Sequence, residues 1–562
     1  MGGDSGDRRL SAFRSLAGSR ALLRVLAAYV MFILTEYAVW IAMLVFAYDR
    51  GGAAIAGLVA VAQLVPAAGA APVVASLADR RSPVILLAGG YVAQAAAMAG
   101  TAAAVIAGAP LAAYAAAVVA ATAVTTTRPA QSALIPSVAA TPDQLTAANV
   151  VVGWLEAAGA AAAGLLAGVL ISLAGVGSVF VVCAGLGLLA GLLVAGLRVA
   201  ALAPASAEQD APAVLAGVGE GLRLAAGQPR LRLMLALLTA DAVVVGALDL
   251  LVVILAISVL GRSQAWVGYL AFAFGVGAML AASGSALLVG RRLGAPILGA
   301  ALVFSGALAA LASGAGLAGT VALLALAGAG HSLLAVATRT LLQRSVPVQL
   351  IGRVFGILEG FMMAGLALGA LLVPALMHLG GSRLAVLGVA AVLPLAAVAG
   401  GRAVFRLDAG TPVPVVEIAL LRSLPLFAEL PAPAIEGLAS ALRPMQLRAG
   451  AVLIRQGDPG DAYYVIAAGE LDAVQDGQFL RRCGRGEGVG EIALLRAIPR
   501  TATVIAHSAA TVYELGREPF LAAVLGHAPT LGQADRIADV RLATRAPRGH
   551  RDGSAAGPAQ PE

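Results

Sequence analysis

Long apolar stretches separated by short polar segments fill most of this chain. They begin at Leu22 and end near Val404, and most have roughly the 20 residues that a helix needs to cross a bilayer. We therefore predict an all-α polytopic membrane domain of about twelve helices, arranged as two sets of six. The first set is expected at residues 22–47, 53–77, 83–107, 110–127, 145–174 and 176–197. The second set is expected at residues 231–260, 265–289, 295–317, 318–338, 351–379 and 384–404.

Arginines are distributed unevenly between the polar segments. Those on one side carry Arg80, Arg81, Arg128, Arg198, Arg223, Arg230, Arg291, Arg292, Arg339 and Arg344. The opposite segments carry little beyond Arg50, Arg262 and Arg383. Because cytoplasmic loops are enriched in Lys and Arg, both termini are predicted to be cytoplasmic, which requires an even number of spans. We expect a multi-pass protein of the cell (plasma) membrane.

The composition is typical of a membrane protein and argues against several other classes of protein. Hydrophobic residues make up 60% of the chain and charged residues 12%, with a mean hydropathy of +0.92. The net charge of +7 is spread between apolar stretches, so we expect no nucleic-acid partner. Cys183 and Cys483 lie in different environments and predict neither a disulfide framework nor a metal site.

The two sets of spans resemble each other in sequence. The matching pieces are Leu34-Thr35-Glu36 with Leu238-Thr239-Ala240-Asp241, Thr127-Arg128 with Thr338-Arg339, and Leu155-Glu156 with Leu358-Glu359. Such pairs are typical of transporters built from repeats. Residues 1–20 are predicted to form a cytoplasmic tail, residues 21–406 the membrane domain with a cytoplasmic linker at 199–230, residues 415–545 a soluble domain, and residues 546–562 a disordered tail.

Two halves of six spans joined by a cytoplasmic linker resemble the major facilitator superfamily. After the second span this family has a charged loop, which Asp79-Arg80-Arg81 matches in part, with Ala75 where the family has glycine. The resemblance implies secondary transport of a small-molecule solute, often driven by protons or another ion. Nothing in the sequence identifies the solute.

Five carboxylates lie within the predicted spans: Glu36, Asp241, Asp249, Glu156 and Glu359. A charge there costs about 2.5–3.5 kcal/mol on insertion scales, so such residues mark candidate transport or coupling sites. Glu36 and Asp241 could carry protons or bind a cationic solute, or they could be paired carboxyl groups that hold helices together. Glu156 and Glu359 are interpreted as ion-pair latches, with Asp249 as a further candidate.

Isolated residues of two other types are assigned no role. His331, His378 and Trp154 lie in or beside apolar helices and are interpreted as packing or interface residues.

Beyond Leu424 the sequence no longer contains long apolar stretches. A helix is predicted at residues 433–442, followed by short strands at 452–454, 463–467, 471–474 and 479–482 with Gly-containing turns between them. This pattern predicts a small antiparallel β-roll with flanking helices.

One segment of this roll carries a motif. Gly490-Glu491-Ile492-Ala493-Leu494-Leu495, followed by Ile498-Pro499-Arg500-Thr501, resembles the phosphate-binding segment of cyclic nucleotide-binding domains, as in catabolite activator proteins and protein kinase A regulatory subunits. The resemblance spans residues 425–542. It implies that Arg500 meets the cyclic phosphate, and that Glu491 accepts a hydrogen bond from the ribose 2′-hydroxyl. Backbone N–H groups from Gly490 to Ala493 can point at the phosphate, and Thr501 is compatible with cAMP or cGMP.

These features together predict a secondary transporter of efflux type, with proton coupling left open, that is regulated by cytosolic cyclic nucleotide. The expected partners are the lipid bilayer, cyclic nucleotide and a solute; cAMP or cGMP is a regulatory ligand, and no cofactor is expected. The alternative is a membrane-anchored nucleotide receptor whose membrane domain moves no solute. An enzyme is not expected, because neither half shows a nucleophile with a base or a metal cluster.

Overall fold

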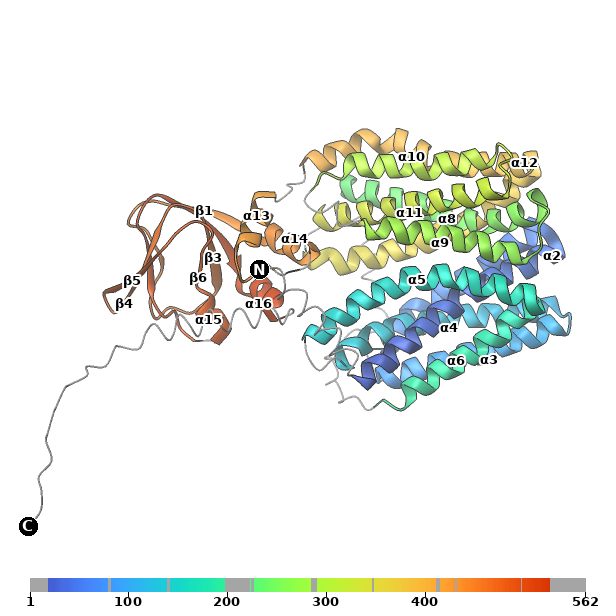
Figure 1. The fold of residues 1–562 in the computed structure, drawn as a ribbon, viewed down its shortest axis with the longest axis horizontal. Coiled ribbons are helices and arrows are strands. Elements are labelled where there is room, and N and C mark those ends of the chain that lie inside the picture. Colours follow the sequence, from blue (N-terminus) through green and yellow to red (C-terminus); the bar gives the residue numbers. More distant parts are fainter. Residues whose placement is uncertain are drawn as a thin grey trace, which may run out of the picture. The chain divides into compact units, whose positions relative to one another are not determined.

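The computed structural model describes residues 19–78, 82–138, 142–197, 223, 227–284, 291–345, 348–410, 415–428, 430, 432–496 and 498–525. The chain divides into two compact units, one within residues 9–413 and one within residues 414–562 (Figure 1). The first is helical throughout its described part, and the second contains all the described strands. A helical domain followed by a β-sheet domain is the order that the sequence predicts.

The helical unit contains ten α-helices and one π-helical turn in its described part. Their bounds are α2 Arg20–Ala78, α3 Pro83–Ile106, α4 Pro110–Val138, α5 Pro142–Ala174, α6 Val176–Ala195, α8 Pro229–Ile254, η1 Leu255–Val259, α9 Ala265–Ser283, α10 Gly294–Leu311, α11 Leu317–Ser345 and α12 Val348–Gly410. Within the described residues, nine helices are long and apolar enough to cross a membrane. The apolar part of α4, Pro110–Val124, is shorter.

Two of these helices are far longer than one span and break at a glycine pair. Gly51 and Gly52 interrupt α2, and Gly380 and Gly381 interrupt α12. The φ angles of Gly52 and Gly381 are 62° and 71°, a region that glycine adopts readily and other residues avoid. Both breaks fall in polar gaps that the sequence predicts between spans.

Several predicted boundaries were wrong. The fourth span was expected to end at residue 127, before a loop containing Arg128, but α4 continues through Arg128 to Val138. The ninth span was expected to reach residue 317, but α10 ends at Leu311 and a turn precedes α11. The loop 79–81, most of the linker 199–230, the terminal tails and residues 526–545 lie outside the described residues.

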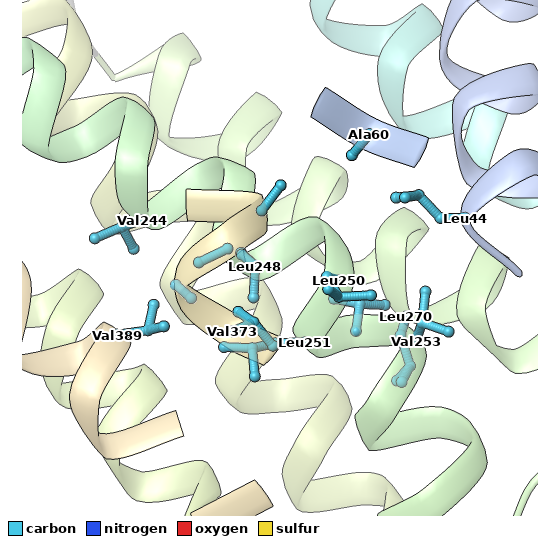
Figure 2. Packing of buried hydrophobic residues seen from close by; sticks show 14 of the residues in the cluster. Leu44, Ala60, Val244, Leu248, Leu250, Leu251, Val253, Leu270, Val373 and Val389 are labelled. Atoms are coloured by element: carbon cyan, nitrogen blue, oxygen red, sulfur yellow. The ribbon is translucent and has the colours of Figure 1, made fainter. Parts of the chain in front are cut away.

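Helix α8 is buried on most sides. Val244, Leu248 and Leu251 of α8 pack with Val373 and Val389 of α12 in one apolar cluster (Figure 2). The two helices approach closely because a Cβ on Gly369 of α12 would overlap the α8 backbone. Polar side chains on α8 are therefore surrounded by other helices.

The second unit has four helices and eight strands in its described part. The helices are α13 Val415–Ser423, α14 Ala432–Ala441, α15 Glu491–Arg496 and α16 Arg517–Leu525. The strands are β1 Arg443–Leu447, β2 Val452–Ile454, β3 Ala462–Ala468, β4 Leu471–Gln475, β5 Gln478–Cys483, β6 Gly488–Val489, β7 Thr503–Ala506 and β8 Ala510–Gly516. They form two antiparallel sheets of four, ordered β1-β8-β3-β6 and β2-β7-β4-β5. Strands β1, β6, β7 and β8 were not predicted.

Aromatic side chains join the helices of this unit to one sheet. The rings of Phe427, Tyr463 and Phe520 contact one another, with Tyr463 and Phe520 centroids 4.9 Å apart. Tyr463 belongs to β3 and Phe520 to α16, so this cluster fixes the helix that ends the described chain against the roll.

Candidate functional sites

The predicted phosphate-binding segment lies between β6 and β7. Gly490 connects β6 to α15 with a φ of 96°, and a Cβ at this position would lie 2.5 Å from Nη1 of Arg500. Glycine is therefore required here both by the backbone angle and by the approach of the arginine.

The Arg500 guanidinium is held in place by three neighbours. Nη1 donates to the Gly490 carbonyl oxygen at 3.0 Å, and Nη2 donates to the Ala462 carbonyl oxygen at 2.7 Å. Nη2 also lies 3.2 Å from Oδ1 of Asp461, whose side chain is 85% exposed. The guanidinium is therefore buried, and the carboxylate beside it remains exposed.

The backbone of Arg500 is tied to a predicted turn. Its N–H donates to the Asp458 carbonyl oxygen, and its carbonyl oxygen accepts from the Gly457 N–H, both at 2.8 Å. The turn that begins at Gly457 therefore contacts the main chain of Arg500, and Asp461 contacts its side chain.

Glu491 and Arg500 are the two charged residues of the second unit that are buried within its described part, with 2% and 5% exposure. Burying a charge is costly unless it is paired or hydrogen bonded, so two buried charges in this segment are a specific feature. Ala493 is also buried, whereas Ile492 and Thr501 are half-buried.

Tyr464 completes this environment. The guanidinium carbon of Arg500 lies 6.0 Å from its ring centroid. Burial, followed by Glu514 and Asp461, raises the pKa of the Tyr464 hydroxyl, so it stays protonated at neutral pH.

A second set of polar contacts lies in the N-terminal half of the helical unit. Arg128 of α4 contacts Glu36 of α2, with Nη2 and Oε2 at 2.8 Å, and Glu156 of α5, with Nη1 and Oε1 at 3.3 Å. Arg128 thus joins three helices and is not a loop residue. Both glutamates are paired in this arrangement, in line with the structural alternative given for Glu36.

The C-terminal half has a different pair. Oδ1 of Asp241 on α8 lies 3.0 Å from Nδ1 of His331 on α11. The interpretation of His331 as an isolated packing residue was therefore wrong. Its partner lies 90 positions away in sequence on another helix, so no local pattern indicated the pair.

The remaining carboxylates are in different surroundings. Trp40 Nε1 donates to Oδ2 of Asp249 at 2.9 Å, a contact that the sequence did not predict. Glu359 is exposed. Arg339, the counterpart of Arg128, contacts the Met362 sulfur at 3.5 Å and pairs with no carboxylate among the described residues. The described residues contain no group of three His, Cys, Asp or Glu placed to hold a metal ion.

Comparisons with known proteins agree with this division of the chain. Residues 25–318, just over half of the chain, match the Major Facilitator Superfamily, and residues 444–527 match the cyclic nucleotide-binding domain.

Curated relatives match about a fifth of the chain. The cAMP-dependent protein kinase regulatory subunit of Aspergillus niger is 38% identical over 104 residues, which are 18% of this chain and 25% of that protein. An uncharacterized protein of Mycobacterium tuberculosis is 37% identical over 119 residues, 21% of this chain and 23% of that protein. The chain thus spans about a quarter of the length of these relatives.

Among solved structures, the regulatory domain of Toxoplasma gondii PKA with cAMP is 27% identical, with 25% of this chain and 56% of that chain covered and a TM-score of 0.22. The helical unit with its apolar, span-length helices and the β-roll with its buried Glu491 and Arg500 account for the two family matches. The chain belongs to the Major Facilitator Superfamily and carries a C-terminal cyclic nucleotide-binding domain that resembles the regulatory subunit of protein kinase A.

Proposed function

We propose that this protein is a secondary transporter whose activity is regulated by a cyclic nucleotide, cAMP or cGMP, bound to its C-terminal domain. The observation that carries this proposal is the buried Arg500 clamp in a domain that belongs to the same chain as a transporter-type helical unit. Because the two domains belong to one chain, binding at the clamp can act on the helical unit through the connecting segment.

The chemistry of the clamp fits a cyclic phosphodiester. Such a group has one negative charge on two exocyclic oxygens, which a planar guanidinium can meet with charge-assisted hydrogen bonds. Arg500 is already oriented by two carbonyl oxygens, so binding requires little ordering of its side chain. We assign Glu491 to the ribose hydroxyl and the backbone from Gly490 to Ala493, with Thr501, to the phosphate and its surroundings.

For the membrane domain, residues 21–406, we propose twelve spans. Nine helices qualify by length and composition; the glycine pairs divide two of them, and Pro110–Val124 adds the remaining one. An even number places both termini on one side, and the arginine distribution assigns that side to the cytoplasm. The nucleotide-binding domain, residues 415–545, is then cytosolic.

Transport is favoured over a pure receptor role by the polar contacts inside the helical unit. Glu36, Asp241 and Asp249 each contact a side chain on another helix, although carboxylates in spans are costly. An inert anchor needs no such contacts to remain folded in a bilayer. Solute uptake or efflux in proteoliposomes separates the two functions.

The nucleotide site is tested by calorimetric titration of the full-length protein in nanodiscs with cAMP and with cGMP. Arg500→Ala is expected to abolish binding, whereas Arg485→Ala, an exposed arginine of the same domain, is expected to bind as the wild type does. Equal binding by wild type and Arg500→Ala would contradict the proposed site.

A further inference from the structure

The last helix of the helical unit extends beyond its apolar span toward the C-terminal domain. The final span was expected to end at residue 404, but α12 continues to Gly410. Helix α13, the first helix of the second unit, begins at Val415. The four residues between these helices reach at most about 15 Å when extended, so a larger displacement of α13 must pull on the end of α12.

Asp408, two positions before this end, is hydrogen bonded to the start of another helix. It is buried, with 4% exposure. Its Oδ1 accepts from the Leu293 N–H at 2.9 Å, and its Oδ2 accepts from the Gly294 N–H at 3.1 Å. Leu293 precedes α10 and has no polar side-chain atom with which to cap it. Asp408 therefore supplies the cap from a position 114 residues further along the chain.

Glycines let α10 and α12 approach each other beside this cap. A Cβ on Gly294 would lie 3.1 Å from a ring carbon of Phe405 and 3.3 Å from Oδ2 of Asp408. One turn further along both helices, a Cβ on Gly401 of α12 would lie 3.6 Å from the Leu298 side chain of α10. The cap is thus part of a packed contact that holds the first turn of α10 against the end of α12.

Helix α11 also holds the segment before α10. Nη1 of Arg344, in the last turn of α11, donates to the Arg291 carbonyl oxygen at 2.9 Å. A Cβ on Gly330 of α11 would lie 2.7 Å from the Phe304 backbone nitrogen of α10, so these two helices pack closely over a longer stretch. A displacement of the start of α10 therefore acts on other helices of the C-terminal half.

We propose that Asp408 is the positioning residue through which nucleotide binding acts on the helical unit, which rests on the regulatory function proposed above. A buried carboxylate that loses its hydrogen bonds is costly, so the cap is either made or replaced by water as the end of α12 moves. Nucleotide that favours one of these two arrangements shifts the helical unit toward the same one. The cap thus converts a displacement of the second unit into a change at the start of α10.

The test is hydrogen–deuterium exchange, measured by mass spectrometry on full-length protein in nanodiscs, with and without saturating cAMP or cGMP. The amide hydrogens of Leu293 and Gly294 exchange when the cap opens. In the wild type, nucleotide is expected to change their exchange rate about fivefold or more, the lower end of ordinary allosteric coupling.

Asp408→Asn keeps the shape of the side chain, but its NH2 group cannot accept a hydrogen bond, so one of the two cap bonds is lost. Without nucleotide, exchange at the start of α10 should be faster than in the wild type. It should no longer respond to nucleotide, which this variant still binds because Asp408 lies outside the nucleotide-binding domain. Asp49→Asn, at an exposed carboxylate of α2, is the matched control and should respond as the wild type does.

Either of two results would overturn the proposal: equal exchange of these amides with and without bound nucleotide in the wild type, or an undiminished nucleotide response in Asp408→Asn. The wild-type comparison alone decides if Asp408→Asn does not fold. Nucleotide that binds in the calorimetric titration but leaves exchange unchanged would refute this route and leave the nucleotide site standing. Absence of binding in that titration would refute the proposed regulation, and this proposal with it.

Discussion

Trp40 of α2 donates a hydrogen bond to Asp249 of α8 at 2.9 Å, joining the two halves of the helical unit. Further along, the hydroxyl oxygens of Tyr48 on α2 and Ser258 on η1, which follows α8, lie 2.6 Å apart. Both contacts lie on the part of each helix that leads to a turn, at Gly51 in one half and after Leu260 in the other. The halves are therefore closed against each other at this end.

The contact between Tyr48 and Ser258 allows regulation by nucleotide to be measured without knowing the solute. The double variant Tyr48→Cys with Ser258→Cys is expected to cross-link rapidly with a short bifunctional thiol reagent, because the two hydroxyl oxygens are in contact. If nucleotide binding biases the two halves, cAMP or cGMP should change the cross-linking rate about fivefold or more. The rate is measured by the mobility of the protein on denaturing gels.

The native thiols Cys183 and Cys483 are both buried and can remain in place. Each single-cysteine variant controls for reaction between molecules. An unchanged rate under saturating nucleotide, in protein that binds the nucleotide, would contradict regulation and favour a tether.

The sequence predicted the helical segments well because span length and apolarity are local properties. It failed at Arg128, where a charge was taken as the end of a span. The charge is tolerated because Glu36 and Glu156 compensate it from other helices, and no local pattern reveals such a pairing. His331 was missed for the same reason, since its partner Asp241 belongs to another helix, α8.

In the second unit, the motif and its spacing predicted the segment from Gly490 to Arg500. They did not predict which strands pair. Strand β1, Arg443–Leu447, is largely exposed and lacks a clear alternation, so its pattern alone did not indicate a strand. Its pairing with β8 supplies the structure that its sequence does not specify. The contact between Arg500 and Ala462 likewise depends on how β3 packs, which the motif does not encode.

Gly490→Ala is expected to weaken nucleotide binding strongly. The new Cβ would lie 2.5 Å from Arg500 Nη1, and the φ of 96° is unfavourable for any other residue, so the guanidinium must move. Gly484→Ala is the matched control, because nothing lies within 4 Å of the added Cβ there. Calorimetry with cAMP and cGMP measures the difference; equal affinities for the two variants would show that the clamp does not contact the ligand.

The Glu36–Arg128 pair is expected to stabilise the helical unit. Glu36→Gln removes the negative charge that faces Arg128 at 2.8 Å and leaves Arg128 with the charge of Glu156 at 3.3 Å. Thermal unfolding of Glu36→Gln, Arg128→Gln and the double variant forms a double-mutant cycle, for which we expect a coupling energy of about 1–3 kcal/mol, as for hydrogen bonds to charged groups. A coupling energy near zero would mean that the two residues act independently.

The packing of α5 against α9 gives the last prediction. Gly268 of α9 lies so close to Gly164 and Gly168 of α5 that an added Cβ would overlap the α5 backbone. Because α5 and α9 belong to different halves, Gly268→Ala should force the halves apart and destabilise the protein by about 1–3 kcal/mol, the usual cost of overpacking. Gly299→Ala on α10 has no atom within 4 Å of its Cβ and should be close to neutral. Unfolding of both variants in the same detergent measures the difference. In the Tyr48→Cys, Ser258→Cys background, Gly268→Ala should also slow cross-linking, and a wild-type rate there would show that the α5–α9 contact does not hold the halves closed.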